Sequence, residues 1–161
     1  MTDLSALLRA LDAAGVEYIL VGGAAATVHG SARLTLDIDV VYRRTPDNLA
    51  HLVAGLAPLR PYLRGAPAGL PFLWDVETLE RGLNFTLTTT LGPIDLLGDI
   101  TGGGRYEQLL SDTVIVSAFG VQCRCITLER LIQVKRAAGR VKDLEAIAEL
   151  EAIREERDRT T

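Results

Sequence analysis

Two aspartates separated by one residue form the most chemically suggestive feature of the sequence. Asp37 and Asp39 lie in the run Leu36-Asp37-Ile38-Asp39-Val40, where aliphatic and acidic residues alternate. Because side chains alternate between the two faces of a strand, this period predicts both carboxylates on one face, roughly 6.6 Å apart, and the aliphatic residues on the other. Two carboxylates on one face repel each other unless solvent or a cation relieves them. The pattern indicates either a Mg²⁺ site, with Mn²⁺ as an alternative, or a solvated edge strand.

A pair of glycines supplies the context for these acids. Gly22 and Gly23 follow an apolar run and precede a short stretch of helix-forming residues. Without side chains, their backbone N–H groups can approach a phosphate closely, although the same pair also suits an ordinary turn. Arg33, in the loop before the acidic run, has the planar guanidinium that suits bidentate phosphate binding. No Gly-Lys-Ser or Gly-Lys-Thr occurs, so a P-loop is excluded.

The combination of these features resembles a known family. The stretch YILVGGAAATVHGSARLTLDIDVVY, from Tyr18 to Tyr42, is similar to the DNA polymerase beta-like nucleotidyltransferase superfamily. The resemblance implies an α+β nucleotidyltransferase fold, with a mixed central β-sheet flanked by helices and with C-terminal helices. It also implies that the glycines and the following loop meet a nucleoside triphosphate and that the acids bind metal. The residues so implicated at the triphosphate are Gly22, Gly23, Arg33 and Thr35.

A third carboxylate is expected from the same resemblance. The family uses an acid on a later strand, and Asp95 is the single acid inside the apolar run Ile94-Asp95-Leu96-Leu97. The expected metal and catalytic set is therefore Asp37, Asp39 and Asp95. Two Mg²⁺ ions held there would organise attack of a hydroxyl on the alpha-phosphorus.

The C-terminal third carries a second resemblance. The stretch CITLERLIQVKRAAGRVKDLEAIAEL, from Cys125 to Leu150, is similar to a prokaryotic branch that includes abortive-infection type IV toxins. Lys135 falls in line with an apolar helical stripe, so it should either snorkel or face a cleft. The resemblance implies that Lys135 contacts the triphosphate, and that Arg140, Lys142 and Asp143 shape the cleft. Arg140 and Lys142 equally suit a solvated helix end.

Periodicity and turn residues predict the elements that position these side chains. Residues 58–78, rich in proline and glycine, match no motif, and we predict an irregular excursion there that holds acceptor specificity. His29 is expected to be a helix-terminus residue rather than a catalyst. The expected helices are 4–14, 24–29, 45–56, 128–138 and one from 142 onward, and the expected strands are 17–21, 36–42, 84–91, 94–97 and two runs within 113–126.

Length and composition limit the remaining possibilities. The chain of 161 residues is predicted to form one domain over 1–150, followed by a charged, frayed tail over 151–161. A net charge of -4 argues against a large nucleic-acid footprint. Cys123 and Cys125 are expected to be small buried residues rather than metal ligands. The sequence shows no secretory signal and no membrane-length apolar run, so a cytoplasmic location without a membrane partner is expected.

The function expected from these features is magnesium-dependent transfer of a nucleoside monophosphate from a triphosphate to an acceptor hydroxyl, with release of pyrophosphate. The acceptor could be a transfer RNA end, a protein hydroxyl or a small alcohol. One alternative is a nucleotide-binding or weakly active member of a toxin–antitoxin pair, with a protein partner. Another is a metal-dependent phosphohydrolase that uses the paired acids differently.

Overall fold

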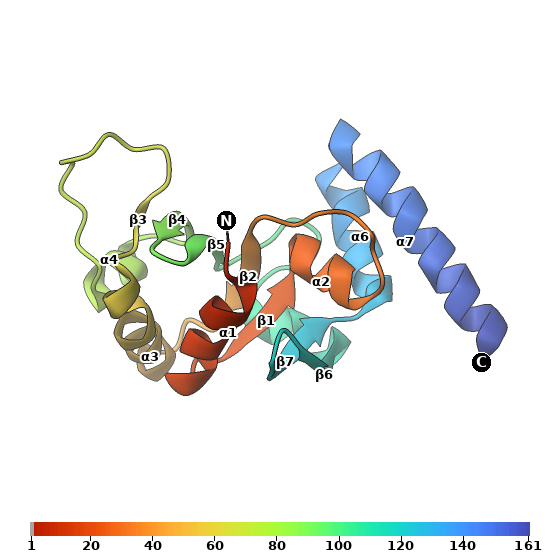
Figure 1. Ribbon diagram of the computed structural model, residues 1–161, viewed down its shortest axis with the longest axis horizontal. Coiled ribbons are helices and arrows are strands. Elements are labelled where there is room, and N and C mark those ends of the chain that lie inside the picture. The colour runs from red at the N-terminus through yellow and green to blue at the C-terminus, as the bar shows by residue number, and fades with distance from the viewer. Residues whose placement is uncertain (1) are drawn as a thin grey trace.

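The strands of the computed structural model, which describes residues 2–161, form one mixed sheet with helices around it (Figure 1). Within that range the strand order is β3-β4-β5-β2-β1-β7-β6. Pairing is parallel between β2 and β5 and between β1 and β7, and antiparallel elsewhere. The strands are β1 (Tyr18–Val21), β2 (Ile38–Tyr42), β3 (Tyr62–Leu63), β4 (Asn84–Thr89), β5 (Gly92–Leu97), β6 (Thr113–Ala118) and β7 (Val121–Ile126). The mixed α+β architecture predicted from sequence is confirmed.

The centre of the sheet is the most apolar part of the structure. All four residues of β1 are buried, and Ile38, Val40 and Val41 of β2 are completely inaccessible. β2 lies between β1 and β5, so both of its edges are hydrogen-bonded within the sheet. The acidic residues of this region are therefore carried on a strand that cannot shift its register without exposing core residues.

The helices begin where side-chain caps are available. Asp3, Thr45, Asp75 and Thr127 each accept a hydrogen bond from the first turn of the helix that follows, which satisfies one otherwise unpaired N–H. The α-helices are α1 (Leu4–Ala13), α2 (Gly22–Val28), α3 (Pro46–Leu56), α4 (Val76–Arg81), α5 (Tyr106–Leu109), α6 (Leu128–Ala138) and α7 (Val141–Thr160), with short 3-10 turns at Ala57–Leu59 and Leu110–Asp112.

Two regions extend from opposite ends of the molecule. The long helix α7 lies beside α6 at one end, and the excursion between β3 and α4 projects at the other (Figure 1). Between them, α2 packs against β1, β2 and α6. This arrangement brings the start of α2, the acidic strands and the C-terminal helices into one region of the molecule.

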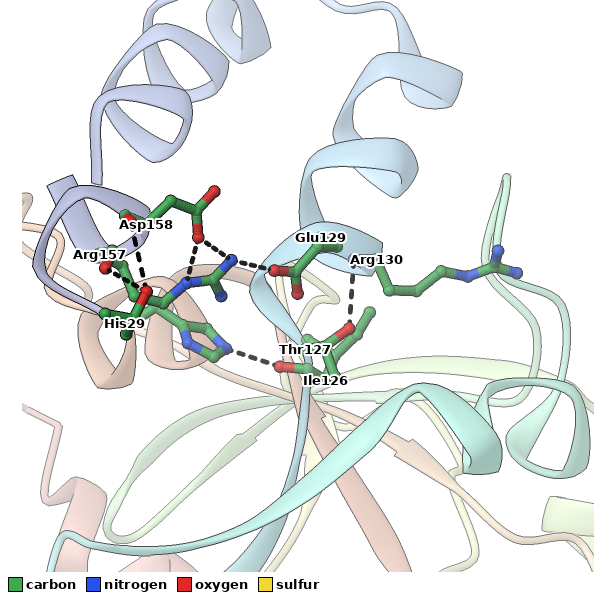
Figure 2. Close-up of polar contacts among 8 residues, drawn as sticks. His29, Ile126, Thr127, Glu129, Arg130, Arg157 and Asp158 are labelled. Carbon is green, nitrogen blue, oxygen red and sulfur yellow. Dashed lines mark hydrogen bonds and ion pairs between the residues drawn. The ribbon is translucent and has the colours of Figure 1, made fainter. Parts of the chain in front are cut away.

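The C-terminal helix continues past the boundary predicted at residue 151. α7 runs without a break to Thr160, and Arg157 forms an ion pair with Glu129 at the start of α6 (Figure 2). Arg136 pairs with Glu151 in the same way. The predicted tail is therefore the second half of a helix, in which Ile153 packs against the core and ion pairs connect the helix to α6.

Three further expectations can be compared with the structure. The strand predicted over 36–42 begins at Ile38, and Leu36 is 59% exposed rather than anchored in the core, because no strand pairs with the chain at that point. Cys123 and Cys125 are unpaired and buried, as predicted. Within residues 2–161, no helix is both long enough and apolar enough to cross a membrane.

Candidate active site

Parallel pairing of β2 with β5 places two of the three predicted acids side by side. Asp39 and Asp95 are register partners, although they are far apart in the sequence. Asp37 lies just before β2, two residues from Asp39 and on the same side of the chain. The side chains of Asp37 and Asp95 are 41% and 22% exposed. The three carboxylates therefore meet at one edge of a cleft, with Asp39 the deepest.

The environment of Asp39 favours its protonated form. Burial raises the pKa of Asp39 to about 7, and a hydrogen bond with Asp95 and the negative charges of Asp95 and Asp37 act in the same direction. A hydrogen bond from the backbone N–H of Gly23 opposes these effects. Without a cation, Asp39 thus keeps its proton to a higher pH than an isolated carboxyl does, as expected when two carboxylates share a site. A bound cation would replace that proton.

Gly22 and Gly23 permit the backbone to approach the acids. Gly22 has a φ of +63°, and a Cβ built on it would lie 2.0 Å from Oδ2 of Asp39. A Cβ on Gly23 would lie 2.8 Å from Oγ1 of Thr35, whose hydroxyl donates to the carbonyl of Asp37. Both glycines form the first turn of α2, where the N-cap residue Val21 supplies no side-chain hydrogen bond and the Gly23 N–H donates to Asp39. A side chain at either position would fill the space beside the acids.

Positive charge reaches the cleft from the C-terminal helices. Nζ of Lys135, whose side chain is only 16% exposed, lies 3.9 Å from a carboxylate oxygen of Asp143. Nε of Arg140 lies 2.8 Å from the same carboxylate, which is almost fully buried. Burial lowers the pKa of Lys135, and the charge of Asp143 acts against that shift. Asp143 thereby fixes two cations that face the acids across the cleft.

The predicted residues line one cleft of about 390 Å³. A smaller pocket of about 260 Å³ adjoins it and shares Asp39, Asp95 and Lys135 with it, but its other walls are largely apolar. The main cleft brings together Gly22, Gly23, Arg33, Thr35, Asp37, Asp39, Asp95, Lys135, Arg140, Lys142 and Asp143. The acids therefore stand between a polar space and a more apolar one.

Arg33 lies in the cleft but already has acidic neighbours. Its guanidinium nitrogens are 3.4 Å from Glu145 and 3.6 Å from Glu149 of α7. Ser31 also donates to Glu149, at 2.6 Å. These contacts tie the loop before β2 to α7, so Arg33 closes one wall of the cleft as well as facing its interior.

His29 has a structural contact, as expected for a helix-terminus residue. Its Nε2 lies 2.7 Å from the carbonyl oxygen of Ile126, so this nitrogen donates to the end of β7 (Figure 2). His29 is not among the residues that line the cleft.

Arg64 is a site residue that sequence reasoning missed. It follows β3 in the segment without a recognisable motif, yet its Nη2 lies 2.8 Å from Oδ1 of Asp95 and its Nη1 lies 3.7 Å from Oδ2 of Asp37. No spacing in the sequence relates Arg64 to these acids. Only the pairing of β3 with β4, and of β4 with β5, brings them together.

The oxygen donors suit a hard divalent cation. Oδ1 of Asp95 is buried and makes no hydrogen bond, although Nη2 of Arg64 lies 2.8 Å from it. As they stand, no three Asp, Glu, His or Cys side chains within residues 2–161 are grouped closely enough to enclose a metal ion. Asp39 and Asp95 are nevertheless adjacent carboxylates, the ligand type that Mg²⁺ prefers. The donor set therefore fits such an ion.

Comparisons with known proteins support the fold. No family model matches the chain, and no curated protein matches it significantly. Among solved structures, it is similar to the crystal structure of a "putative nucleotidyltransferase" from Thermotoga maritima. The TM-score is 0.55, with 14% sequence identity over 89% of this chain and 88% of that one. The chain therefore shares its overall fold with that protein.

Proposed function

We propose that this chain is a magnesium-dependent nucleotidyltransferase. One observation carries the proposal: a single cleft holds the Asp39–Asp95 pair, the Gly22-Gly23 turn and Lys135. A metal-bound triphosphate needs carboxylates to bind its metal ion, and it needs cations and accessible backbone N–H groups to bind its phosphates. The structural neighbour named as a nucleotidyltransferase supports the same assignment.

The proposed reaction joins an acceptor hydroxyl to the alpha-phosphorus of a nucleoside triphosphate. The bond from the alpha-phosphorus to its bridging oxygen breaks, pyrophosphate leaves with that electron pair, and the hydroxyl proton passes to Asp95. Asp39 and Asp95 would hold the divalent cation, with Asp37 beside them, and the cation would supply Lewis-acid polarisation and a lowered hydroxyl pKa. Gly22 and Gly23 would admit the phosphates close to the backbone, while Lys135 would neutralise charge on the pyrophosphate.

The lining of the cleft indicates which parts of a substrate would bind to each side of it. Lys135 and Arg140 line both spaces and match the charged phosphates, whereas the adjoining pocket adds the apolar side chains of Leu97, Ile100 and Val134. Transfer RNA, a protein hydroxyl and a small alcohol each present a hydroxyl that could reach Asp95 from that side. The acceptor is therefore best found by experiment.

The test is transfer of label from each alpha-phosphate-labelled nucleoside triphosphate, with Mg²⁺ and cell extract. Wild type is compared with Asp39→Asn and with Asp47→Asn, the same change at an exposed position of α3. We expect label to move to an acceptor with wild type and Asp47→Asn only. Released inorganic phosphate would favour a phosphohydrolase, and nucleotide binding without transfer would favour the binding member of a toxin–antitoxin pair.

A further inference from the structure

Arg64 is held at the acids by the backbone of the sheet. Its own N–H donates to the carbonyl of Thr86 at 3.0 Å, and its Nη2 donates to the carbonyl of Leu87 at 2.7 Å. Both acceptors belong to β4, which lies between β3 and β5. The side chain is 29% exposed. The guanidinium is therefore fixed across β4, with Nη1 beside the carboxylate of Asp37 and Nη2 beside that of Asp95.

The position of the guanidinium matches that of a bridging cation. Nη2 approaches Asp95 at 2.8 Å and Nη1 approaches Asp37 at 3.7 Å, so one planar group spans two of the three acids. Arg64 lines neither the main cleft nor the adjoining pocket, whereas Asp39 and Asp95 line both. Arg64 thus neutralises the acids from outside the space available to a substrate.

We propose that the Arg64 guanidinium occupies the place of one of two divalent cations, so that the site takes a single divalent ion, held by Asp39 and Asp95 on the cleft side. This inference rests on the proposed function. Three ionised aspartates carry three negative charges, which one guanidinium and one divalent ion balance. A second divalent ion would stand beside the fixed guanidinium, where like charges repel.

Counting bound Mn²⁺ tests the inference without reference to catalysis. The electron paramagnetic resonance signal of free Mn²⁺ is followed during titration of the full chain without nucleotide, because triphosphates bind Mn²⁺ themselves. We expect one ion per wild-type chain. Arg64→Gln should bind a second ion at least about tenfold more tightly than wild type does, whereas Arg64→Lys, which retains the charge, should still bind one.

A matched variant controls for loss of charge alone. Arg60→Gln removes the same charge from an exposed side chain in the same segment and should leave one ion bound. Two tight ions in wild type, or one ion in a folded Arg64→Gln variant, would overturn the inference and leave the proposed function standing. Absence of Mn²⁺ binding to wild type would overturn the metal site itself, and with it both proposals.

Discussion

Asp39 and Asp95 are register partners on adjacent parallel strands, and burial together with this proximity raises the pKa of Asp39 to about 7. When both carboxylates are ionised, their repulsion lowers the free energy of unfolding. Two acids that approach each other in a buried position must either be protonated or bind a cation. The protonation of this pair is therefore coupled to the stability of the fold.

The first prediction concerns stability and pH. The pKa of Asp39 is about 7 in the folded protein and close to 3.9 in an unfolded chain, so the folded state binds the proton more strongly. Protonation of Asp39 therefore contributes up to about 4 kcal/mol to the free energy of unfolding. This contribution is fully present below pH 4 and is lost as the pH rises through 7. Urea unfolding with chelator should show this fall between pH 4 and 7 in wild type. Asp39→Asn should lack it, and parallel curves for the two proteins would contradict the assignment.

The second prediction separates activity from stability at the same residue. Asp39→Asn should lower label transfer about a thousandfold, equivalent to about 4 kcal/mol of lost transition-state stabilisation. Above pH 7 and without metal, it should be at least as stable as wild type, because a buried repulsion has been removed. Thermal unfolding of wild type and Asp39→Asn tests the predicted difference in stability. A variant that loses activity only because it unfolds would refute this account.

The third prediction uses two glycines with the same backbone handedness. Gly22→Ala should prevent Mn²⁺ binding and destabilise the protein by about 1–3 kcal/mol beyond backbone strain, because its Cβ would overlap the Asp39 carboxylate. Gly65 also has positive φ, at +79°, but has open space around it. Gly65→Ala should therefore cost only the strain, about 1–2 kcal/mol, and leave Mn²⁺ binding intact. Similar losses of Mn²⁺ binding in both would contradict the expected close approach.

The fourth prediction compares two lysines of the cleft. Lys135→Met should weaken binding of ATP with Mg²⁺ by about ten- to hundredfold, the range expected for a charge-assisted contact in a partly buried site. Lys142 is exposed, so Lys142→Met should change binding by less than about threefold. Calorimetric titration distinguishes them. An equal loss of ATP affinity in both variants would mean that the cleft attracts nucleotide through the combined positive charge of its basic residues and not through a direct contact with Lys135.

Local patterns predicted much of what lies near the acids. The alternation around Asp39 predicted a strand, the cap at Thr127 predicted the start of α6, and both elements are observed. The hairpin of β4 and β5 was also predicted, but its turn lies at residues 90–91, and the predicted turn residues Gly92 and Pro93 instead begin β5. These features depend on residues close in sequence, where turn chemistry and periodicity are informative.

Contacts between distant segments could not be predicted in the same way. Parallel pairing of β2 with β5 leaves no local signal, so only the family resemblance suggested Asp95. Arg64 had no signal at all, because its role depends on the addition of β3 to the sheet edge. The pairing of Arg33 with Glu145 and Glu149 likewise depends on where α7 lies.

The distribution of the site along the chain has a consequence for synthesis. The acids are all present once β5 has emerged from the ribosome, whereas Lys135 and the helix that carries Asp143 come last. A nascent chain therefore displays repelling carboxylates before it has the cationic wall that faces them. Because domains form as the chain emerges, the cationic wall should face the acids only after α6 and α7 have been synthesised and have docked.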